Sequence, residues 1–159
     1  MQWVAVSQSM GAKYAWLTAK HGCGFLLWPT QTKLPDGRPY GYDVGAPSAG
    51  SHIDVVKEWM EQLRAVGMGP GLYYSLKDNY YLNAAAGGLV KTGPLLPGQE
   101  KVTQAQFEAL ELAQLTELWS NYGELAETWF ALDWIYLEIP DTIILTARFH
   151  DSTILVPDF

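Results

Sequence analysis

The sequence is short of cysteine, of basic residues and of long apolar runs, and each shortage excludes a class of protein. A single cysteine, Cys23, among 159 residues rules out an internal disulfide framework. Basic residues number 10 against 17 acidic ones, for a formal net charge of -7, and form no basic stripe. This balance disfavours nucleic acid and anionic membrane surfaces as partners. No apolar run approaches the roughly 18 residues that a membrane-spanning helix needs, and we expect no signal peptide.

Apolar and aromatic residues are plentiful instead. Apolar residues make up 48% of the chain and aromatic residues 13%, with 7 tryptophans and 9 tyrosines. This is enough for a packed core, so we expect one compact domain or a piece of a larger one.

Helical and strand patterns alternate along the first part of the chain. Helices are expected at 2–10, between Ser51 and Gly67, and between Thr103 and Gly123. Strands are expected at 13–19, 69–75 and 124–130. This alternation predicts right-handed crossovers and a parallel sheet, the α/β class of fold.

Each expected helix has an apolar face. The residues that share these faces are, in chain order, Trp3, Val6 and Met10; Val56, Trp59, Met60 and Leu63; and Leu112, Leu115, Leu118, Trp119 and Tyr122. We expect the last group to face inward. Ser51 with Asp54, and Thr103 with Gln106, have the spacing of capping boxes.

The links that follow the strands are long, at roughly 20–52 and 76–102, whereas the links that precede them are short. In parallel α/β folds the functional residues gather in the loops after the carboxyl ends of the strands. A site is therefore expected near His21, Ser75 and Phe130.

His21 and Cys23 stand two residues apart in a glycine-rich loop. A thiol nucleophile would need the imidazole to favour the thiolate and a third group to orient the ring. A zinc site would need three or four ligands, whereas His52 and His150 lie far off in the sequence. The flanking residues match no thiol-enzyme signature. We therefore expect neither a catalytic cysteine nor a metal, and interpret Cys23 as a small side chain in a turn.

Aromatic residues end the expected strands. Tyr73 and Tyr74 end the second strand, Trp129 and Phe130 end the third, and His21 follows the first. An aromatic ring can stack on the C–H face of a sugar while His and Tyr side chains bond its hydroxyls. Packing of the same aromatics against loops is the other interpretation, and both stay open on the residues alone.

Asp78, Asp133 and Glu138 are the carboxylates nearest those strand ends. A retaining glycosidase needs two carboxyl groups roughly 5–5.5 Å apart. A charge after a strand is also commonly a solvated loop residue or a helix cap. The glycine-rich patterns of phosphate- and dinucleotide-binding loops are absent, and we expect no cofactor.

Three long blocks, Gly11–Thr30, Asp54–Asn83 and Gly93–Phe130, together resemble the α-L-fucosidases of glycoside hydrolase family 29. The resemblance covers about residues 2–130 and implies a retaining hydrolase that releases terminal α-L-fucose from glycans on a (β/α)8 barrel. A whole barrel takes about 250 residues. We therefore predict an α/β fold in which residues 1–130 form a truncated, partial TIM-type barrel of about three βα units. Residues 131–159 are expected to be a short, divergent β-rich tail outside the family.

The resemblance also implies which residues contact the sugar. The family pattern Lys-His-His-Asp-Gly-Phe reads Lys20 to Phe25 here, but Gly22 and Cys23 replace its second histidine and its aspartate. The substrate-binding residues implied are His21, Trp28, Tyr73, Tyr74 and Trp129, with Tyr74 preferred over Tyr73 as the tyrosine that touches the sugar.

Ala131 stands where the family has its nucleophile, the aspartate that follows Trp129 and Phe130. Asp133 would share a face of an extended strand with residue 131, but would lie roughly 6–7 Å further along. Catalysis is sensitive to displacements of about 1 Å. Asp133 is therefore a weak substitute, no catalytic residue is assigned, and we expect the chain to be catalytically impaired.

An α-L-fucosidase by descent, impaired in catalysis, is the interpretation that we adopt. A non-catalytic fucose-binding module and a product without biochemical role are the alternatives. The expected partner is a fucosylated glycan, with no nucleic acid and no membrane, and the oligomeric state is left open. The family implies a secreted or lysosomal setting.

Overall fold

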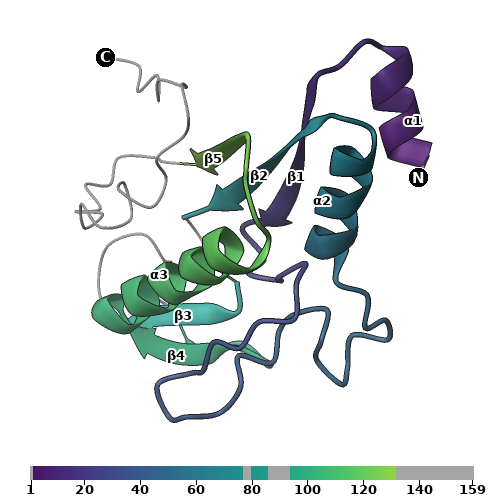
Figure 1. Cartoon of the computed structure of the whole chain (residues 1–159). Helices are drawn as coiled ribbons and strands as arrows, with labels where there is room; N and C mark the ends of the chain where they lie inside the picture. The colour runs from purple at the N-terminus through teal and green to yellow at the C-terminus, as the bar shows by residue number, and fades with distance from the viewer. Residues whose placement is uncertain (1, 77–79, 86–93, 132–159) are drawn as a thin grey trace, which may run out of the picture.

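The computed structural model describes residues 2–76, 80–85 and 94–131. Three helices and five strands lie in these ranges (Figure 1). In chain order they are α1 (Gln2–Ser9), β1 (Tyr14–Lys20), α2 (Val55–Ala65), β2 (Gly69–Ser75), β3 (Leu82–Ala85), β4 (Glu100–Thr103), α3 (Gln104–Asn121) and β5 (Glu127–Ala131). The tail predicted at 131–159 lies outside the described residues except for Ala131.

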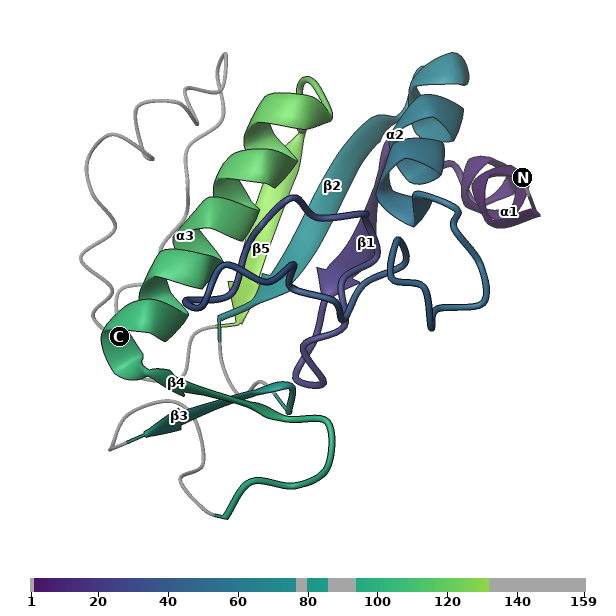
Figure 2. The ribbon, with the colours of Figure 1, turned by 90° about the horizontal axis from the view of Figure 1, so that it is seen from below.

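The main sheet has three parallel strands in the order β1-β2-β5. Leu72 of β2 pairs with Leu17 on one side and with Thr128 on the other, so β2 is the central strand. Helices α2 and α3 pack their apolar faces on one side of the sheet, and α1 lies beyond α2 (Figures 1 and 2). The predicted alternation of helices and parallel strands is thus confirmed.

A second, small parallel sheet, β3 with β4, lies beyond the carboxyl ends of β1 and β2 (Figure 2). From the sequence, this stretch is expected to be part of a long loop. Strands of only four residues carry too little periodicity to be recognised. The Glu100 carboxylate on β4 is held by both terminal nitrogens of Arg38, at 3.0 and 2.7 Å, which ties the small sheet to the loop after β1.

The helix ends follow local chemistry. Thr103 and Gln106 form the predicted capping box of α3. The prediction for α2 was wrong: its N-cap is Asp54, whose side chain accepts a hydrogen bond from the Lys57 amide at 2.9 Å, and Ser51 lies outside the helix. Gly123 closes α3 with a φ of 73°, a left-handed conformation that glycine adopts without steric cost.

The predicted apolar face of α2 is confirmed, with Val56, Met60 and Leu63 fully buried. In α3, Leu115 and Leu118 are buried as expected, but Leu112 is 37% exposed. Glu111 and Gln114 take inward positions instead, and both are buried. The face of α3 is therefore turned from the apolar stripe that its leucines suggest, because these two polar side chains meet partners on the sheet.

Helix α1 differs from the other two. Its predicted apolar face is exposed, since Trp3 is 77% and Met10 78% accessible and Val6 is likewise open. Val4 is the α1 residue that packs into the fold, in a small cluster with Leu63 and Met68.

None of the helices among the described residues has both the length and the apolar character of a membrane span.

Candidate functional site

The face of the main sheet opposite α2 and α3 carries aromatic side chains and is open, in that no helix or strand among the described residues covers it. Trp16 of β1 and Trp129 of β5 approach each other across the central strand, with ring centroids 5.8 Å apart. The Trp16 ring lies over Gly71, where an added Cβ would come within 2.3 Å of it. The glycine therefore provides the space that lets Trp16 lie across β2, where it approaches Trp129.

His21 lies at the carboxyl end of β1 and points to the same open face. Its ring stacks on that of Tyr73 at a centroid separation of 5.7 Å and an interplanar angle of 25°. His21 is exposed and Tyr73 half-buried. Tyr73 pairs in register with Trp129, which is 56% exposed. Three of the predicted sugar-contacting residues, His21, Tyr73 and Trp129, therefore gather near one edge of the sheet.

Tyr74 and Trp28, two further predicted sugar contacts, point elsewhere. Side chains alternate between the faces of a strand, so Tyr74 faces the helices, where it is completely buried and donates to Gln114 Oε1 at 2.6 Å. Trp28 is 1% exposed and donates from Nε1 to the Glu117 carboxylate at 2.8 Å. Of the two tyrosines, Tyr73 and not the preferred Tyr74 is the one that reaches the open face.

Ala131 is the last residue of β5 and pairs with Ser75 at the end of β2. The position that the resemblance assigns to the nucleophile therefore lies at the carboxyl edge of the sheet, at the same end as His21. Asp78, Asp133 and Glu138 lie outside the described residues. Cys23 is an exposed free thiol, and within the described ranges no three His, Cys, Asp or Glu side chains cluster as a metal would require.

A buried charged cluster that the sequence analysis missed lies on the helix side of this edge. Lys20 Nζ contacts a Glu111 carboxylate oxygen and donates to the Ser75 carbonyl at 3.0 Å. It also lies 4.5 Å from the centroid of the Tyr74 ring. Burial lowers the pKa of the Lys20 ammonium and raises the pKa of Glu111, while the attraction between them opposes both shifts. Glu111 and Gln114 within the apolar stripe of α3 were the signal available in the sequence.

Glu117 on α3 organises the first long loop. Its carboxylate accepts from Trp28 Nε1, from the Thr30 hydroxyl at 2.6 Å and from the Gln31 amide at 2.8 Å. One helix residue thus fixes three successive parts of the loop that follows β1. Trp28 is part of this anchor.

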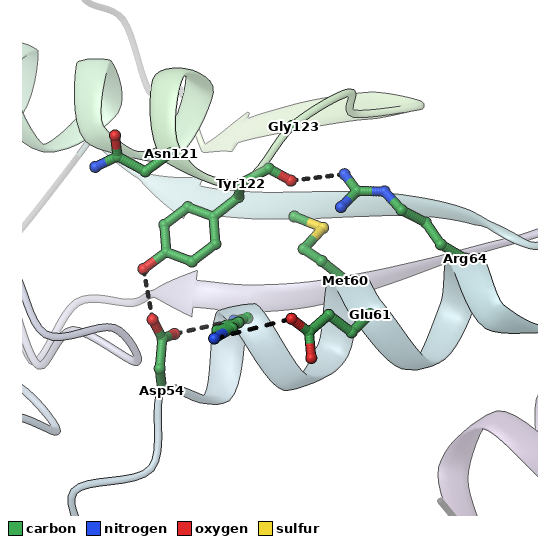
Figure 3. Close-up of a pocket in the computed structure, with 8 residues that line it drawn as sticks. Asp54, Met60, Glu61, Arg64, Asn121, Tyr122 and Gly123 are labelled. Atoms are coloured by element: carbon green, nitrogen blue, oxygen red, sulfur yellow. Dashed lines mark hydrogen bonds and ion pairs between the residues drawn. The ribbon is translucent and has the colours of Figure 1, made fainter.

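A pocket of about 440 Å³ lies in the helix layer, between α2 and α3 (Figure 3). The Tyr122 hydroxyl donates to Asp54 at 2.8 Å, and Arg64 Nη2 donates to the main-chain carbonyls of Tyr122 and Glu124. Burial, ahead of the hydrogen bond to Asp54, raises the pKa of Tyr122. These polar groups join one helix to the other, so we assign the pocket to packing.

The open edge of the sheet has the chemistry of a sugar site. The faces of Trp129 and Tyr73 can stack on C–H bonds, and the exposed imidazole of His21 can exchange hydrogen bonds with hydroxyls. No described side chain at this edge supplies the carboxylate pair that glycoside hydrolysis requires.

Comparisons with known proteins agree with one another. The model of the family Alpha-L-fucosidase matches residues 1–153 and so extends beyond residue 130. An α-L-fucosidase of Branchiostoma floridae is 38% identical over 97% of the chain and 31% of its own length. Plasma α-L-fucosidase of Pongo abelii is 30% identical over 96% of the chain and 33% of its own length. The chain thus spans about a third of these two curated relatives.

Solved structures show the same likeness. An α-L-fucosidase from Lactobacillus casei, in complex with its α-L-fucose product, superposes with a TM-score of 0.71 at 25% identity, over 92% of the chain and 48% of that structure. A glycoside hydrolase 29 family member from an unknown rumen bacterium gives a TM-score of 0.58 at 29% identity, over 84% of the chain and 20% of that structure.

Proposed function

The chain belongs to the α-L-fucosidase family, and from this premise we propose that it binds terminal α-L-fucose of glycans at the open edge of its sheet. The observation that carries the proposal is the joint placement of His21, Tyr73 and Trp129 on one face. In this proposal the Trp129 ring stacks on the sugar, and His21 and Tyr73 bond its hydroxyls. The complex of the Lactobacillus casei relative with its fucose product supports the choice of sugar.

We also propose that the chain as written does not hydrolyse fucosides. The family nucleophile position is occupied by Ala131, whose methyl group cannot form a glycosyl-enzyme intermediate. Asp133 is two residues further along, roughly 6–7 Å away if the strand continues. A retaining mechanism and its loss at Ala131 both belong to this proposal.

The test is to restore the carboxylate. We expect the natural chain to leave a chromogenic α-L-fucoside at the background rate and Ala131→Asp to release the chromophore measurably faster. Ala131→Asn is the matched control, because it has the same shape without a nucleophilic carboxylate. A natural chain that hydrolyses the fucoside at a rate typical of the family would refute the claim of impairment.

Binding without hydrolysis is the function that these two proposals describe together, and it is favoured by the retention of His21 and Trp129 beside Ala131. Titration calorimetry of the natural chain with millimolar L-fucose would register heat under this candidate. The absence of heat from a folded protein would remove the binding role and leave a chain without sugar recognition.

The rest of the proposal concerns context. Residues 1–130 supply about three βα units of a (β/α)8 barrel, and fucosylated glycans are the partner. We place the chain in a secreted or lysosomal setting, supported by relatives that include a plasma α-L-fucosidase. Fractionation of cells that express the chain tests this placement, and recovery in the cytosol alone would contradict it.

A further inference from the structure

The end of β1 departs from regular strand geometry. Thr18 pairs with Tyr73, but the next pair joins Lys20 to Tyr74, so two steps along β1 match one step along β2. Ala19 is the extra residue, and both Ala19 and Lys20 are buried. This is the pattern of a β-bulge, which turns the residues beyond it by one position.

The bulge determines the faces of the sheet to which the Lys20 and His21 side chains point. In an unbroken strand, Lys20 would share the open face with Thr18, and His21 would turn toward the helices. With the extra residue, the Lys20 side chain lies under α3. His21 lies on the open face, where it is exposed and stacks on Tyr73 at 5.7 Å.

Lys20 is held under α3 by groups from two other elements. Its ammonium contacts the Glu111 carboxylate on α3 and donates to the Ser75 carbonyl at the end of β2. It lies between the Tyr74 ring at 4.5 Å and the Phe107 ring at 5.7 Å. A buried ammonium is costly unless it is paired, so these partners define one favourable position for the lysine.

We propose that Lys20 is a positioning residue, whose buried pairing with Glu111 fixes the bulge at Ala19 and thereby sets His21 against Tyr73 on the open face. Lys20 touches no sugar in this account and acts through His21. Its consequence for fucose recognition rests on the proposed function, whereas its consequence for the His21 ring does not.

A pair that positions His21 can be distinguished from a pair that only stabilises the fold. Replacing a buried ion pair by apolar residues of similar size is often neutral or stabilising. A purely structural pair would therefore be replaceable by Lys20→Met with Glu111→Leu, without effect beyond the core. If the pair positions His21, the same double variant folds but frees the ring from Tyr73.

The test is proton NMR of the whole chain. The sequence contains 3 histidines, and His21→Gln identifies the His21 ring signals by their disappearance. We expect nuclear Overhauser contacts between His21 and Tyr73 in the natural chain. In Lys20→Met/Glu111→Leu we expect these contacts to be lost and the His21 resonances to move. Retention of the contacts in the folded double variant overturns the proposal.

Two further variants make the result specific. Leu118→Ala removes a buried side chain from the same helix without touching the ion pair, so it should lower stability yet preserve the His21–Tyr73 contacts. Glu111→Gln keeps the shape of the side chain and removes its charge, and should also move the His21 resonances. If the double variant fails to fold, unchanged His21 resonances in Glu111→Gln overturn the proposal.

Fucose titrations keep this inference distinct from the proposed function. If both hold, the double variant binds fucose up to about tenfold more weakly, the worth of one hydrogen bond. Loss of the ring contacts in a chain whose natural form binds no fucose would uphold the positioning role and reject the proposed function. If the double variant keeps its ring contacts and the natural chain binds fucose, the positioning role is rejected and the proposed function is upheld.

Discussion

Single carboxylates of α3 govern this structure at the scale of the residue. Glu111 pairs with the buried Lys20 of β1. Glu117 accepts hydrogen bonds from the loop that follows β1. The two glutamates lie on the same helix but act on different parts of the first βα unit. Their effects should therefore be separable by substitution.

Glu117→Ala should destabilise the fold by about 1–3 kcal/mol, because it leaves the buried Trp28 Nε1 without its acceptor and removes the hydrogen bonds of Thr30 and Gln31. Urea unfolding measures the loss, and faster hydrogen exchange at the Gln31 amide would locate it in the loop. Glu108→Gln, an exposed site on the same helix, should change stability little. Equal stability of Glu117→Ala and the natural chain would contradict the anchoring role.

Tyr81 gives the fold an alkaline limit. Burial, followed by the charge of Glu100, raises its pKa to about 12, and its hydroxyl donates to the Tyr40 carbonyl. Unfolded tyrosine releases its proton near pH 10. The unfolded state therefore holds fewer protons between pH 10 and about 12, and stability falls as pH rises through that range.

We expect Tyr81→Phe to make this alkaline loss of stability shallower, as measured by urea unfolding at several pH values. Tyr80→Phe changes the exposed neighbour and should leave the slope as it is. An identical slope in Tyr81→Phe and the natural chain would show that Tyr81 does not couple to unfolding.

Helix boundaries provide the clearest test at the scale of the element. Asp54→Ala should destabilise α2 by about 1 kcal/mol or more, because Asp54 caps the helix and also accepts from Tyr122. Ser51→Ala should have almost no effect, since Ser51 lies outside the helix. Thermal unfolding of the two variants compares the assignments directly, and a larger effect at Ser51 would restore the capping box expected from the sequence.

The sequence predicted elements better than it predicted orientations. Helix α3 was predictable because its capping box, its closing glycine and its apolar spacing agree. Helix α2 was predictable from its apolar spacing and closing glycine, although its N-cap was not. The bulge at Ala19 was not, since Thr-Ala-Lys-His reads as an ordinary strand end and the lysine's partner lies 91 residues away. The same long-range contact explains why Leu112 was placed inward and Glu111 was not. Tyr73 and Tyr74 are adjacent on β2 and point to opposite faces, so which of them reaches the open face depends on which side of the sheet the helices cover, and the sequence does not show that side.

At the scale of the whole molecule, the described residues form a parallel sheet that helices cover on one face and leave open on the other. Helices α2 and α3 cover the first face. The second face carries Trp16, Tyr73 and Trp129, and so unites residues from all three strands of the sheet. A ligand that contacts all three of these residues can therefore bind only when the three strands of the sheet are paired.

We accordingly expect L-fucose to stabilise the folded chain. At about 100 times its dissociation constant, a ligand of the native state adds about 2.7 kcal/mol to the free energy of unfolding. Thermal unfolding with increasing fucose measures the effect, with D-glucose as the control sugar. His21→Ala should retain the stability of the sugar-free chain, since His21 is exposed, but lose the response to fucose. A melting temperature that ignores fucose would argue against the site.

The bulge at Ala19 also bears on how relatives of this chain should be aligned. Deleting Ala19, the extra residue, would leave the lysine opposite Tyr74 and the histidine on the open face, because the regular alternation of an unbulged strand then gives the same two faces. A relative that lacks the bulge can therefore present the same two side chains to the same faces with one residue fewer before the histidine. An alignment of such a relative needs a one-residue gap at Ala19, because without the gap its histidine would be paired with Lys20, which points to the opposite face of the sheet.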